Sequence, residues 1–425
     1  MKGHPVISII GGTIWGNRGA ESMLVTVIGK LRETLPGARF NIFTYYPAKD
    51  RELVTDESVT ILSSKPFSLA TRHFLGALII AILKKLDVKA PTGNFFEIAR
   101  AISKSDLLLD IGGITFSDGR EKYLPFNILT IWPAMLLRVP VVKMAQAVGP
   151  FRSWLNRLFA NIFLFRCAHI FARGEKTAEF LKELNFPVER FETVSDIAFL
   201  YLPEYSLSEE NTNKVEELVN SIHQEKKNGK RAIVFSPSIL VEQESKKMRL
   251  DYTRKFLDVI KDLGNDSFSY IFIPNATRDS SEKAHNNDLL VIDRIREMAI
   301  KGGLPSDLLA AVEWVNYDIN SASIRKIIGE CDVLVTSRYH AMISGLALMI
   351  PTIVIGWGHK YRETMDYFDL EKYSLDFSDP TIDLTATVIE ILKKNSAIRN
   401  QIKTHLPDVK AKSETQFSYL SRVLS

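Results

Sequence analysis

The chain has 425 residues, a length that exceeds one typical hydrophobic core and predicts two domains. Hydrophobic residues make up 46% and charged residues 24%, an ordinary globular composition that excludes a disordered chain. The 54 basic and 50 acidic residues leave a net charge of +4, which is too small to favour nucleic-acid binding. The basic excess is local, because residues 69–182 hold 16 Lys and Arg against 8 Asp and Glu. This predicts either a basic face on the N-terminal half or an ordinary solvated surface.

The composition also bears on the cellular compartment. Cys167 and Cys331 lie in apolar runs without metal-type or disulfide-type spacing, which predicts reduced core residues. The N-terminal residues lack the apolar core and cleavage site of a signal peptide. The longest uncharged apolar run, residues 74–83, is shorter than the roughly 20 residues of a membrane span and predicts a buried or interfacial helix. We therefore expect a soluble cytoplasmic protein.

Apolar β-branched runs alternate with helical patterns along the chain. In the first half, strands are predicted at residues 6–10, 40–45, 59–62, 107–111, 141–146, 169–173 and 191–194, with helices at 20–35 and 175–184. In the second half, strands are predicted at residues 232–237, 270–274, 310–315, 332–337 and 352–357. Strands that alternate with helices indicate parallel sheets with right-handed crossovers.

A polar stretch separates the two halves. Residues 206–230 contain no strand pattern and predict a linker with a surface helix. The sequence therefore predicts an α/β protein of two doubly wound, Rossmann-like domains facing a cleft, at residues 1–205 and 231–425. The last residues, SETQFSYLSRVLS, have helical spacing and are expected to pack on either domain.

Two glycine segments follow predicted strands of the first domain. Residues 11–22, GGTIWGNRGAES, open the first helix, and residues 110–120, DIGGITFSDGR, follow the fourth strand. The first segment lacks the Lys and Ser/Thr of a P-loop and does not match a dinucleotide fingerprint. Two such loops at carboxyl ends of strands suit a polar ligand such as a sugar, or form tight turns only. The residues expected to contact this ligand are Asn17, Gly19, Glu21, Asp110, Gly112, Gly113 and Arg120.

Four basic residues follow other predicted strands. Arg173 closes the strand at residues 169–173, Arg338 and His340 follow the strand before TSRYHA, and Lys360 follows the strand at 352–357. Ligands of open α/β sheets bind at these strand ends. Guanidinium groups match phosphate and carboxylate geometry, and a histidine donates to an anion or acts as an acid near neutral pH. The alternative for each residue alone is a surface ion pair or a structural histidine.

Other patterns exclude several site classes. The sequence has no HExxH, no G-x-S-x-G, no EF-hand loop and no Asp-x-Asp of a nucleotide-sugar metal site. We therefore expect no metal and no cofactor. Asp279 and Asp288 surround an NNDLL segment, for which a solvated loop is the favoured interpretation.

Several segments, in order along nearly the whole chain, resemble the polysaccharide pyruvyl transferase family. These segments are NRGAE (17–21), DIGG (110–113), AQAVGP (145–150), ARGEKT (172–177), SDIAF (195–199), SRYHA (337–341) and GWGHK (356–360). SRYHA resembles the most specific family motif, S-R-x-H-A. The chain departs from the family pattern at Ile114, Thr177 and Ile197, where the family has glycine, serine and proline.

The resemblance implies a GT-B-like pair of domains and transfer of the enolpyruvyl group of phosphoenolpyruvate to sugar hydroxyls, giving a pyruvate ketal in polysaccharide or cell-envelope glycan biosynthesis. Arg173, Arg338 and His340 match family positions that hold the donor, and Lys360 matches a later family lysine. We expect Arg338 and Arg173 to clamp the anions and His340 to be the general acid or a phosphate ligand, with Glu21 or Asp110 as the base. The acceptor is expected to be a free, nucleotide-linked or lipid-linked saccharide.

Two other function classes stay open. A nucleotide-sugar glycosyltransferase of the same fold would use an acidic residue on the ribose, for which Glu363 and Asp366 are candidates. A non-catalytic sugar-binding protein of the same fold is the other alternative. Residues 153–166 have an amphipathic character suited either to the inner face of an anionic membrane or to the core.

Overall fold

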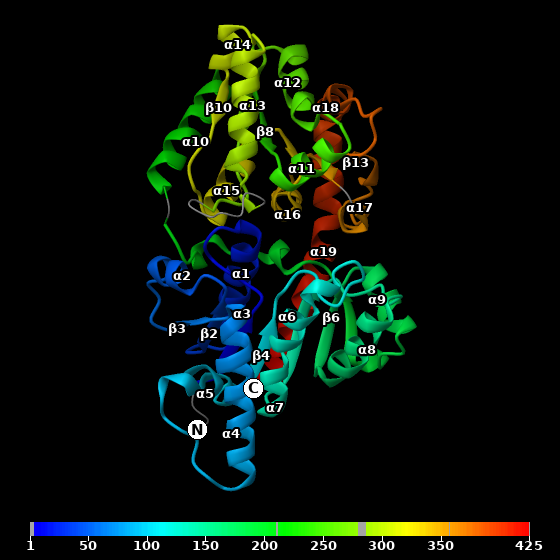
Figure 1. The fold of residues 1–425 in the computed structure, drawn as a ribbon. Helices are drawn as coiled ribbons and strands as arrows, with labels where there is room; N and C mark the ends of the chain where they lie inside the picture. Colours follow the sequence, from blue (N-terminus) through cyan, green and yellow to red (C-terminus); the bar gives the residue numbers. More distant parts are fainter. Residues whose placement is uncertain (1–3, 210, 279–285, 357, 425) are drawn as a thin grey trace. The chain divides into compact units, whose positions relative to one another are not determined.

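The computed structural model describes residues 4–209, 211–278, 286–356 and 358–424 (Figure 1). By its internal contacts the chain forms two compact units. The first contains the chain up to Trp15, Met23–Leu207 and Lys410–Ser425, and the second contains Gly16–Ser22 and Ser208–Val409. Residues 16–22 were predicted in the first domain but belong to the second unit. Residues 410–425 were predicted in the second domain but belong to the first unit.

The first unit is built on a seven-stranded parallel sheet. The strand order β3-β2-β1-β4-β5-β6-β7 places the reversal of the chain between β1 and β4. The strands are β1 (Val6–Ile10), β2 (Arg39–Thr44), β3 (Val59–Ser63), β4 (Leu107–Asp110), β5 (Val141–Gln146), β6 (His169–Arg173) and β7 (Phe191–Val194). The inner strands β1, β4, β5 and β6 are nearly continuous runs of buried residues because helices cover both faces of the sheet, whereas the edge strands β3 and β7 are partly exposed.

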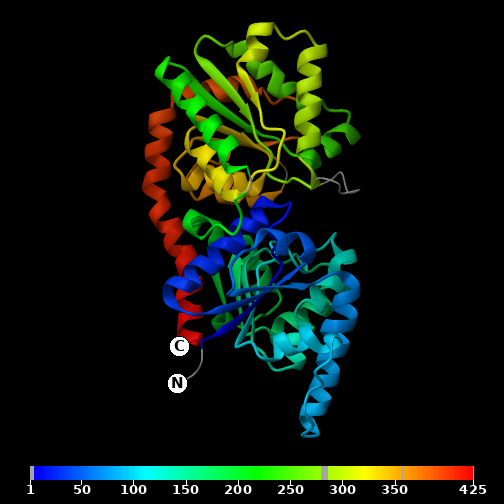
Figure 2. The same cartoon turned by 90° about the vertical axis from the view of Figure 1, so that its left-hand side faces the viewer.

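Helices flank this sheet on two sides. In Figure 2, α1 and the end of α19 lie on one side and the helices from α4 to α8 lie on the other. The helices are α1 (Arg18–Thr34), α2 (Pro47–Leu53), α3 (Pro66–Ser68), the π-helical η1 (Leu69–Leu75), α4 (Gly76–Lys85), α5 (Glu97–Ser103), α6 (Leu124–Leu129), α7 (Trp132–Leu136), α8 (Trp154–Phe163) and α9 (Glu175–Glu183).

The second unit repeats the architecture with six parallel strands in the order β10-β9-β8-β11-β12-β13. The strands are β8 (Arg231–Ser236), β9 (Phe268–Phe272), β10 (Val312–Trp314), β11 (Val333–Thr336), β12 (Thr352–Gly356) and β13 (Ser374–Asp376). The helices are α10 (Thr212–Lys227), α11 (Ile239–Lys247), α12 (Tyr252–Leu263), α13 (Leu289–Lys301), α14 (Ser306–Ala310), α15 (Ser321–Gly329), α16 (Tyr339–Ala347), α17 (His359–Asp366), α18 (Leu384–Lys393) and α19 (Asn395–Leu424). The prediction of two Rossmann-like domains is confirmed for each unit.

The last turns of α19 belong to the first unit. The Ser413 hydroxyl donates to the carbonyl of Asp196 at 2.9 Å, and the Gln416 amide donates to the carbonyl of Ser195 at 3.2 Å. Glu414 forms an ion pair with Lys30 of α1 at 2.8 Å. The C-terminal residues thus pair with the loop that follows β7.

The apolar run at residues 74–83 is part of a longer helix than the sequence predicted. Continuous helical structure extends over Pro66–Lys85, and by length and composition alone this segment is sufficient to cross a membrane. Only 33% of its most apolar window is buried. The helix is longer than the apolar run, because Pro66–Leu75 continue it on its N-terminal side.

His73 lies inside this helical segment and is buried. Its ring is buried against Phe43, and Nε2 lies 2.8 Å from the carbonyl oxygen of Ser63. Burial lowers the pKa of His73 from 6.5 to about 4. In the same unit, burial lowers the pKa of His169 to about 4 as well.

We expect the free energy of unfolding of the first unit to fall as the pH drops from 6.5 to 4. The unfolded chain binds a proton at His73 in this window while the folded chain does not, which removes about 3 kcal/mol by pH 4. The variant His73→Gln should flatten the dependence in chemical unfolding followed against pH, with a residual slope from His169. The exposed-site variant His4→Gln is the control, and an unchanged slope in His73→Gln would contradict this assignment.

Candidate functional site

The turn between β11 and α16 in the second unit presents the S-R-x-H-A residues. The Thr336 hydroxyl accepts a hydrogen bond from the backbone N–H of Arg338 at 2.9 Å, which closes a short turn after the strand. Arg338 has extended backbone angles at the N-cap of α16, and its side chain does not cap the helix. Gly345 lets α16 pack tightly, because a Cβ there would lie 2.5 Å from Thr352 Oγ1. Arg338 and His340 therefore lie on a firmly packed strand–helix junction.

Arg338 is held by a buried carboxylate. Its Nη2 forms an ion pair with Oδ1 of Asp288, which is fully buried, while the Arg338 side chain is 15% exposed. Asp288 also accepts backbone hydrogen bonds from Ile239, Asn275 and Ala276 at 3.1, 3.2 and 2.9 Å. Within the part of the chain that the structure describes, Nε of Arg338 is buried without a hydrogen-bond partner. The solvated-loop interpretation is therefore wrong for Asp288, and Asp279 lies outside the described residues.

His340 lies against the NRGAE segment. A Cβ on Gly19 would approach Nδ1 of His340 to 2.2 Å, so only glycine fits beside this ring. The prediction placed Gly19 with the acceptor side of the N-terminal domain, but residues 16–22 group with the second unit. The glycine at this position thus serves the close approach of the first turn of α1 to the imidazole.

The neighbouring residues of the same turn form a buried charge network. Arg18 pairs with Glu21 at 2.9 Å and with Asp318 at 2.6 Å. Glu21 also accepts the backbone N–H of Ser321 at 3.0 Å, and burial raises its pKa above the usual value. Asn17 accepts the backbone N–H of Ala20 through its side-chain oxygen at 3.2 Å. Glu21 is thus fully buried and bound within the protein, which does not favour its predicted role as the base.

Lys360 on α17 lies close to the Arg338–His340 turn. Its Nζ is 4.9 Å from the ring centroid of Tyr339, the residue between Arg338 and His340. Tyr361 donates to the carbonyl of Ser337 at 3.3 Å, which joins the start of α17 to the same turn. The second unit therefore brings three of the predicted donor residues to one edge of its sheet.

The first unit presents the DIGG loop beside the first glycine segment. Gly11 has a φ of +92°, and a Cβ there would lie 2.5 Å from the backbone nitrogen of Gly112. Asp110 Oδ1 accepts the N–H of Gly112 at 2.9 Å, while Oδ2 pairs with Lys143 at 2.5 Å. Asp110 therefore fixes the loop through a buried ion pair.

Arg173 links three segments at the same edge of this sheet. Its Nη1 pairs with Asp196 at 2.9 Å, and its Nη2 donates to the carbonyl of Gly113 at 2.9 Å. The side chain is only 6% exposed. Arg120, in contrast, is exposed on the loop that follows, with its guanidinium 5.2 Å from the ring centroid of Tyr123. Arg173 thus orders the DIGG loop, and Arg120 is accessible.

The sequence prediction did not single out Lys143, Asp196 or Arg18. A charged residue in the apolar strand VVKMAQ was a visible signal for Lys143, and Asp196 stood in the SDIAF motif without an assigned role. No cluster of metal-ligating side chains occurs among the described residues.

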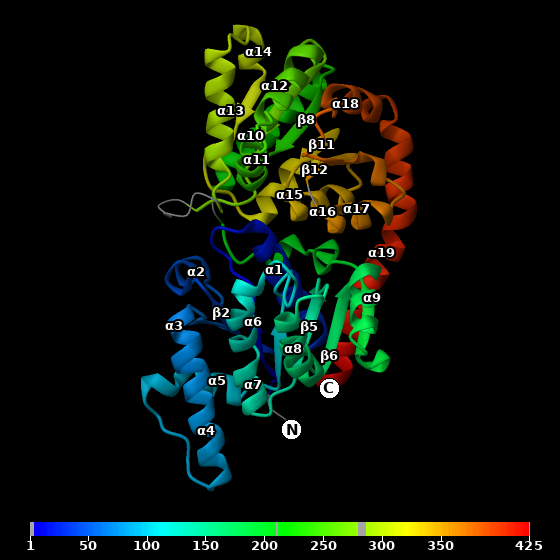
Figure 3. The same cartoon turned by 45° about the vertical axis from the view of Figure 1, so that its right-hand side comes forward.

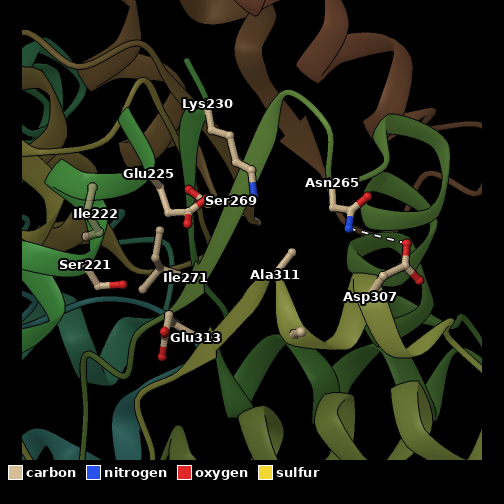
Figure 4. Close-up of a pocket in the computed structure, with 11 residues that line it drawn as sticks. Ser221, Ile222, Glu225, Lys230, Asn265, Ser269, Ile271, Asp307, Ala311 and Glu313 are labelled. Atoms are coloured by element: carbon tan, nitrogen blue, oxygen red, sulfur yellow. Dashed lines mark hydrogen bonds and ion pairs between the residues drawn. The ribbon is translucent and has the colours of Figure 1, made fainter. Parts of the chain in front are cut away.

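A pocket of about 340 Å³ lies elsewhere in the second unit, near the amino-terminal ends of β8 and β9 (Figure 4). Lys230 pairs there with Glu225 at 2.7 Å, and Asn265 donates to Asp307 at 3.4 Å. It contains none of the predicted site residues. It lies at the edge of the sheet opposite to the SRYHA turn.

Solved structures with a similar fold include UDP-GlcNAc 2-epimerases and a complex with UDP. A putative UDP-N-acetylglucosamine 2-epimerase from Listeria monocytogenes has a TM-score of 0.60 and 10% identity, covering 99% of this chain and 96% of that one. UDP-GlcNAc 2-epimerase from Neisseria meningitidis, bound to UDP-GlcNAc, has a TM-score of 0.56 and 12% identity, covering 98% and 100%. The S. aureus MnaA–UDP structure has a TM-score of 0.54 and 13% identity, covering 94% and 91%. At this identity the similarity establishes the two-domain Rossmann-like fold alone.

The sequence itself matches a family description. The model of the family described as "Polysaccharide pyruvyl transferase" matches residues 17–359. The match begins at Asn17, within NRGAE, and extends past SRYHA. Because it spans most of the chain, the protein belongs to the polysaccharide pyruvyl transferase family.

Proposed function

We propose that this protein transfers the pyruvyl group of phosphoenolpyruvate to a saccharide and forms a pyruvate ketal. The observation that carries the proposal is the orientation of Arg338 by the buried Asp288 at the start of α16, in a chain of this family. Asp288 engages Nη2, and Nε has no partner among the described residues, so the guanidinium retains donor capacity for an anion.

The donor carries a phosphate and a carboxylate on one small frame, so more than one cationic group must bind it. In the second unit we assign Arg338 and Lys360 to these anions. The N-terminus of α16, a helix of nine residues, adds backbone N–H groups and the positive end of its dipole. We assign no anion to Arg173, because its guanidinium contacts Asp196 and the carbonyl of Gly113.

The reaction needs one proton and two hydroxyl groups. Protonation of the methylene carbon gives an oxocarbenium-like centre at the adjacent carbon, and a sugar hydroxyl attacks this carbon. This first hydroxyl releases its proton, and the C–O bond to phosphate breaks with its electron pair on the phosphate. A second hydroxyl then attacks the same carbon, releases its proton and closes the ketal ring. We assign the proton transfer to the methylene carbon to His340.

The acceptor belongs, in this proposal, to the loops of the first unit. Gly112 and Gly113 expose backbone without side chains, and Arg120 is the accessible charged residue of the same loop. The Asp110–Lys143 pair and Arg173 hold this loop in place. Asp110 is thus a positioning residue here, and the base that receives the hydroxyl proton is left to water or to the released phosphate.

The solved structures with bound UDP or UDP-GlcNAc support a nucleotide-linked acceptor, and also the alternative of a nucleotide-sugar glycosyltransferase. The two acidic residues that could bind a ribose differ in solvent exposure: Asp366 is exposed on α17, and Glu363 is partly buried. A UDP titration in parallel with phosphoenolpyruvate separates the two functions. If only UDP or a UDP-sugar binds, the glycosyltransferase replaces the pyruvyl transferase. If neither ligand binds, with or without a saccharide present, the non-catalytic alternative holds.

Replacing Arg338 by Ala should weaken phosphoenolpyruvate binding at least tenfold in isothermal titration calorimetry. A hydrogen bond to a charged group contributes about 1.5–3 kcal/mol, and Arg338→Lys should recover little because an ammonium is a point charge. The matched control is Arg254→Ala, because Arg254 pairs with Asp258 on an exposed face of α12. Equal affinities in wild type and Arg338→Ala would contradict the donor site.

Asp288→Asn should weaken phosphoenolpyruvate binding several-fold and lower the free energy of unfolding by about 3 kcal/mol. The amide leaves a guanidinium without its anionic partner and cannot accept all of the present backbone hydrogen bonds. Asp258→Asn breaks an exposed ion pair and should change unfolding by less than about 1 kcal/mol, with binding unaffected. Binding that stays at the wild-type value in Asp288→Asn would show that Arg338 does not depend on this carboxylate.

His340→Ala should lower turnover about a hundredfold or more while phosphoenolpyruvate still binds within a few-fold of the wild-type affinity. The measurement is acceptor-dependent release of phosphate from phosphoenolpyruvate. His405→Ala, which removes a partly exposed histidine paired with Asp369, is the control. Activity within a few-fold of wild type in His340→Ala would remove His340 from the proton transfer.

A further inference from the structure

Helix α4 and the π-helical η1 before it carry an exposed apolar stripe. Leu75, Ile79, Ile82 and Leu86 follow one another at spacings of four, three and four residues, which places them on one face of the helix. Their exposed fractions are 43%, 38%, 49% and 66%. Val88 extends the stripe beyond the end of α4 with 50% exposed. Large apolar side chains that are exposed to solvent on one face of a helix indicate a surface that a membrane or another molecule covers.

The opposite face of the same helix packs on the first unit. Ala77 and Ile80 are buried in the hydrophobic core, and a Cβ on Gly76 would contact Ala99 of α5 at 3.2 Å. Lys84 donates to Ser103 of α5 at 2.8 Å. The helix is therefore an integral part of the unit, although its length and composition would let it cross a membrane. With one face on protein, the exposed stripe suits a position along a surface rather than through a bilayer.

The basic residues around the stripe favour an anionic surface as its partner. Residues 65–104 contain seven Lys and Arg against two Asp and Glu, an excess of five positive charges. Lys85 and Lys89 are exposed near the end of the stripe, and Arg72 is exposed near its beginning. An apolar face with basic side chains at both ends is the arrangement of helices that lie in the headgroup region of anionic lipids.

A second helix of the same layer has matching features. Aromatic contacts run from Phe74 through Trp132 to Phe163 of α8, with centroid distances of 4.5 and 5.4 Å. Trp154 and Leu158 of α8 are 74% and 45% exposed. Tryptophan favours the membrane–water interface. Figure 3 shows α4, α7 and α8 on the same side of the first sheet.

We propose that the α4 stripe docks the first unit on an anionic lipid surface, with Leu75, Ile79, Ile82 and Leu86 among the acyl-chain ends and Arg72, Lys85 and Lys89 on the headgroups. The α4 helix lies along the surface and does not span it. This inference is independent of the proposed pyruvyl transfer, because all its residues belong to the first unit and none of them touches an assigned donor residue.

Co-sedimentation of the full chain with lipid vesicles tests the proposal. Wild type should bind vesicles of phosphatidylcholine mixed with phosphatidylglycerol, and bind pure phosphatidylcholine at least about tenfold more weakly, because each juxtamembrane basic residue contributes about 1 kcal/mol. The double variant Ile82→Ser/Leu86→Ser should lose at least about tenfold in affinity for the mixed vesicles. Lys85→Glu/Lys89→Glu should lose the preference for anionic lipid.

The matched control is Val188→Ser/Val423→Ser, which removes two exposed valines of the first unit outside the stripe and should bind as wild type does. Calorimetric titration of phosphoenolpyruvate and thermal unfolding of each variant establish that folding is intact.

Wild type that fails to sediment with mixed vesicles, or a stripe variant that binds equally well, overturns the proposal. Resistance of the bound protein to alkaline carbonate would overturn it in favour of a spanning helix. Conversion of a dimer to a monomer by the stripe variant in sedimentation velocity, without vesicle binding by wild type, would assign the stripe to a second copy of the chain.

Discussion

Burying a charge costs several kcal/mol unless an opposite charge and hydrogen bonds accompany it, and this constraint shapes the carboxyl edge of both sheets. Each edge uses buried ion pairs to fix the loops that follow its strands. In the first unit Asp110 pairs with Lys143, and Arg173 pairs with Asp196. In the second unit Asp288 pairs with Arg338. These pairs contribute orientation more than net stability, because an apolar core of equal volume is often as stable.

The close packing of glycine segments follows from the same need for fixed loops. Gly11 combines a positive φ with a contact to the backbone of Gly112 that leaves no room for a side chain. At Gly19 the φ is ordinary, and the reason for glycine is the His340 ring. The two positions thus have different physical causes, although both belong to the same glycine-rich segment. Only the first is a turn requirement of the kind that the sequence pattern suggested.

Most strands could be predicted from the sequence because a strand depends on a local pattern of residues. Residues 6–10, 141–146, 169–173 and 191–194 were predicted with the bounds that the structure shows. The first three are the buried runs typical of parallel strands, whereas the edge strand at 191–194 is partly exposed. β13 was not predicted, because Ser374–Asp376 is three residues long and has no apolar run. The placement of residues 410–425 on the first unit depends on tertiary contacts with Ser195 and Asp196, which no local pattern contains.

The candidate site was accessible to sequence reasoning only in part, for the same reason. Arg338 and His340 stand two residues apart after a strand, so their neighbourhood followed from the strand–helix boundary. Asp288 is 50 residues away in sequence and sits among polar residues, where composition favoured a solvated loop. Its burial arises from backbone N–H groups of Asn275 and Ala276 that need an acceptor once β9 ends. A carboxylate satisfying these donors then becomes an anionic partner for Arg338, which follows β11.

The choice of cation at each buried pair agrees with its geometry. Lys143 is fully buried, and its ammonium reaches Asp110, Gln146 and Thr115 at 2.5, 3.0 and 3.3 Å, a partner for each of its three donors. A planar guanidinium would not direct its donors to three acceptors grouped around one point. At Arg173 the partners, Asp196 and the carbonyl of Gly113, come from two separate loops, and the fork of the guanidinium reaches both. Lys143 therefore satisfies buried acceptors inside the first unit, whereas Arg173 connects two loops at the edge of its sheet. Arg338 has the guanidinium chemistry suited to an anion that binds reversibly.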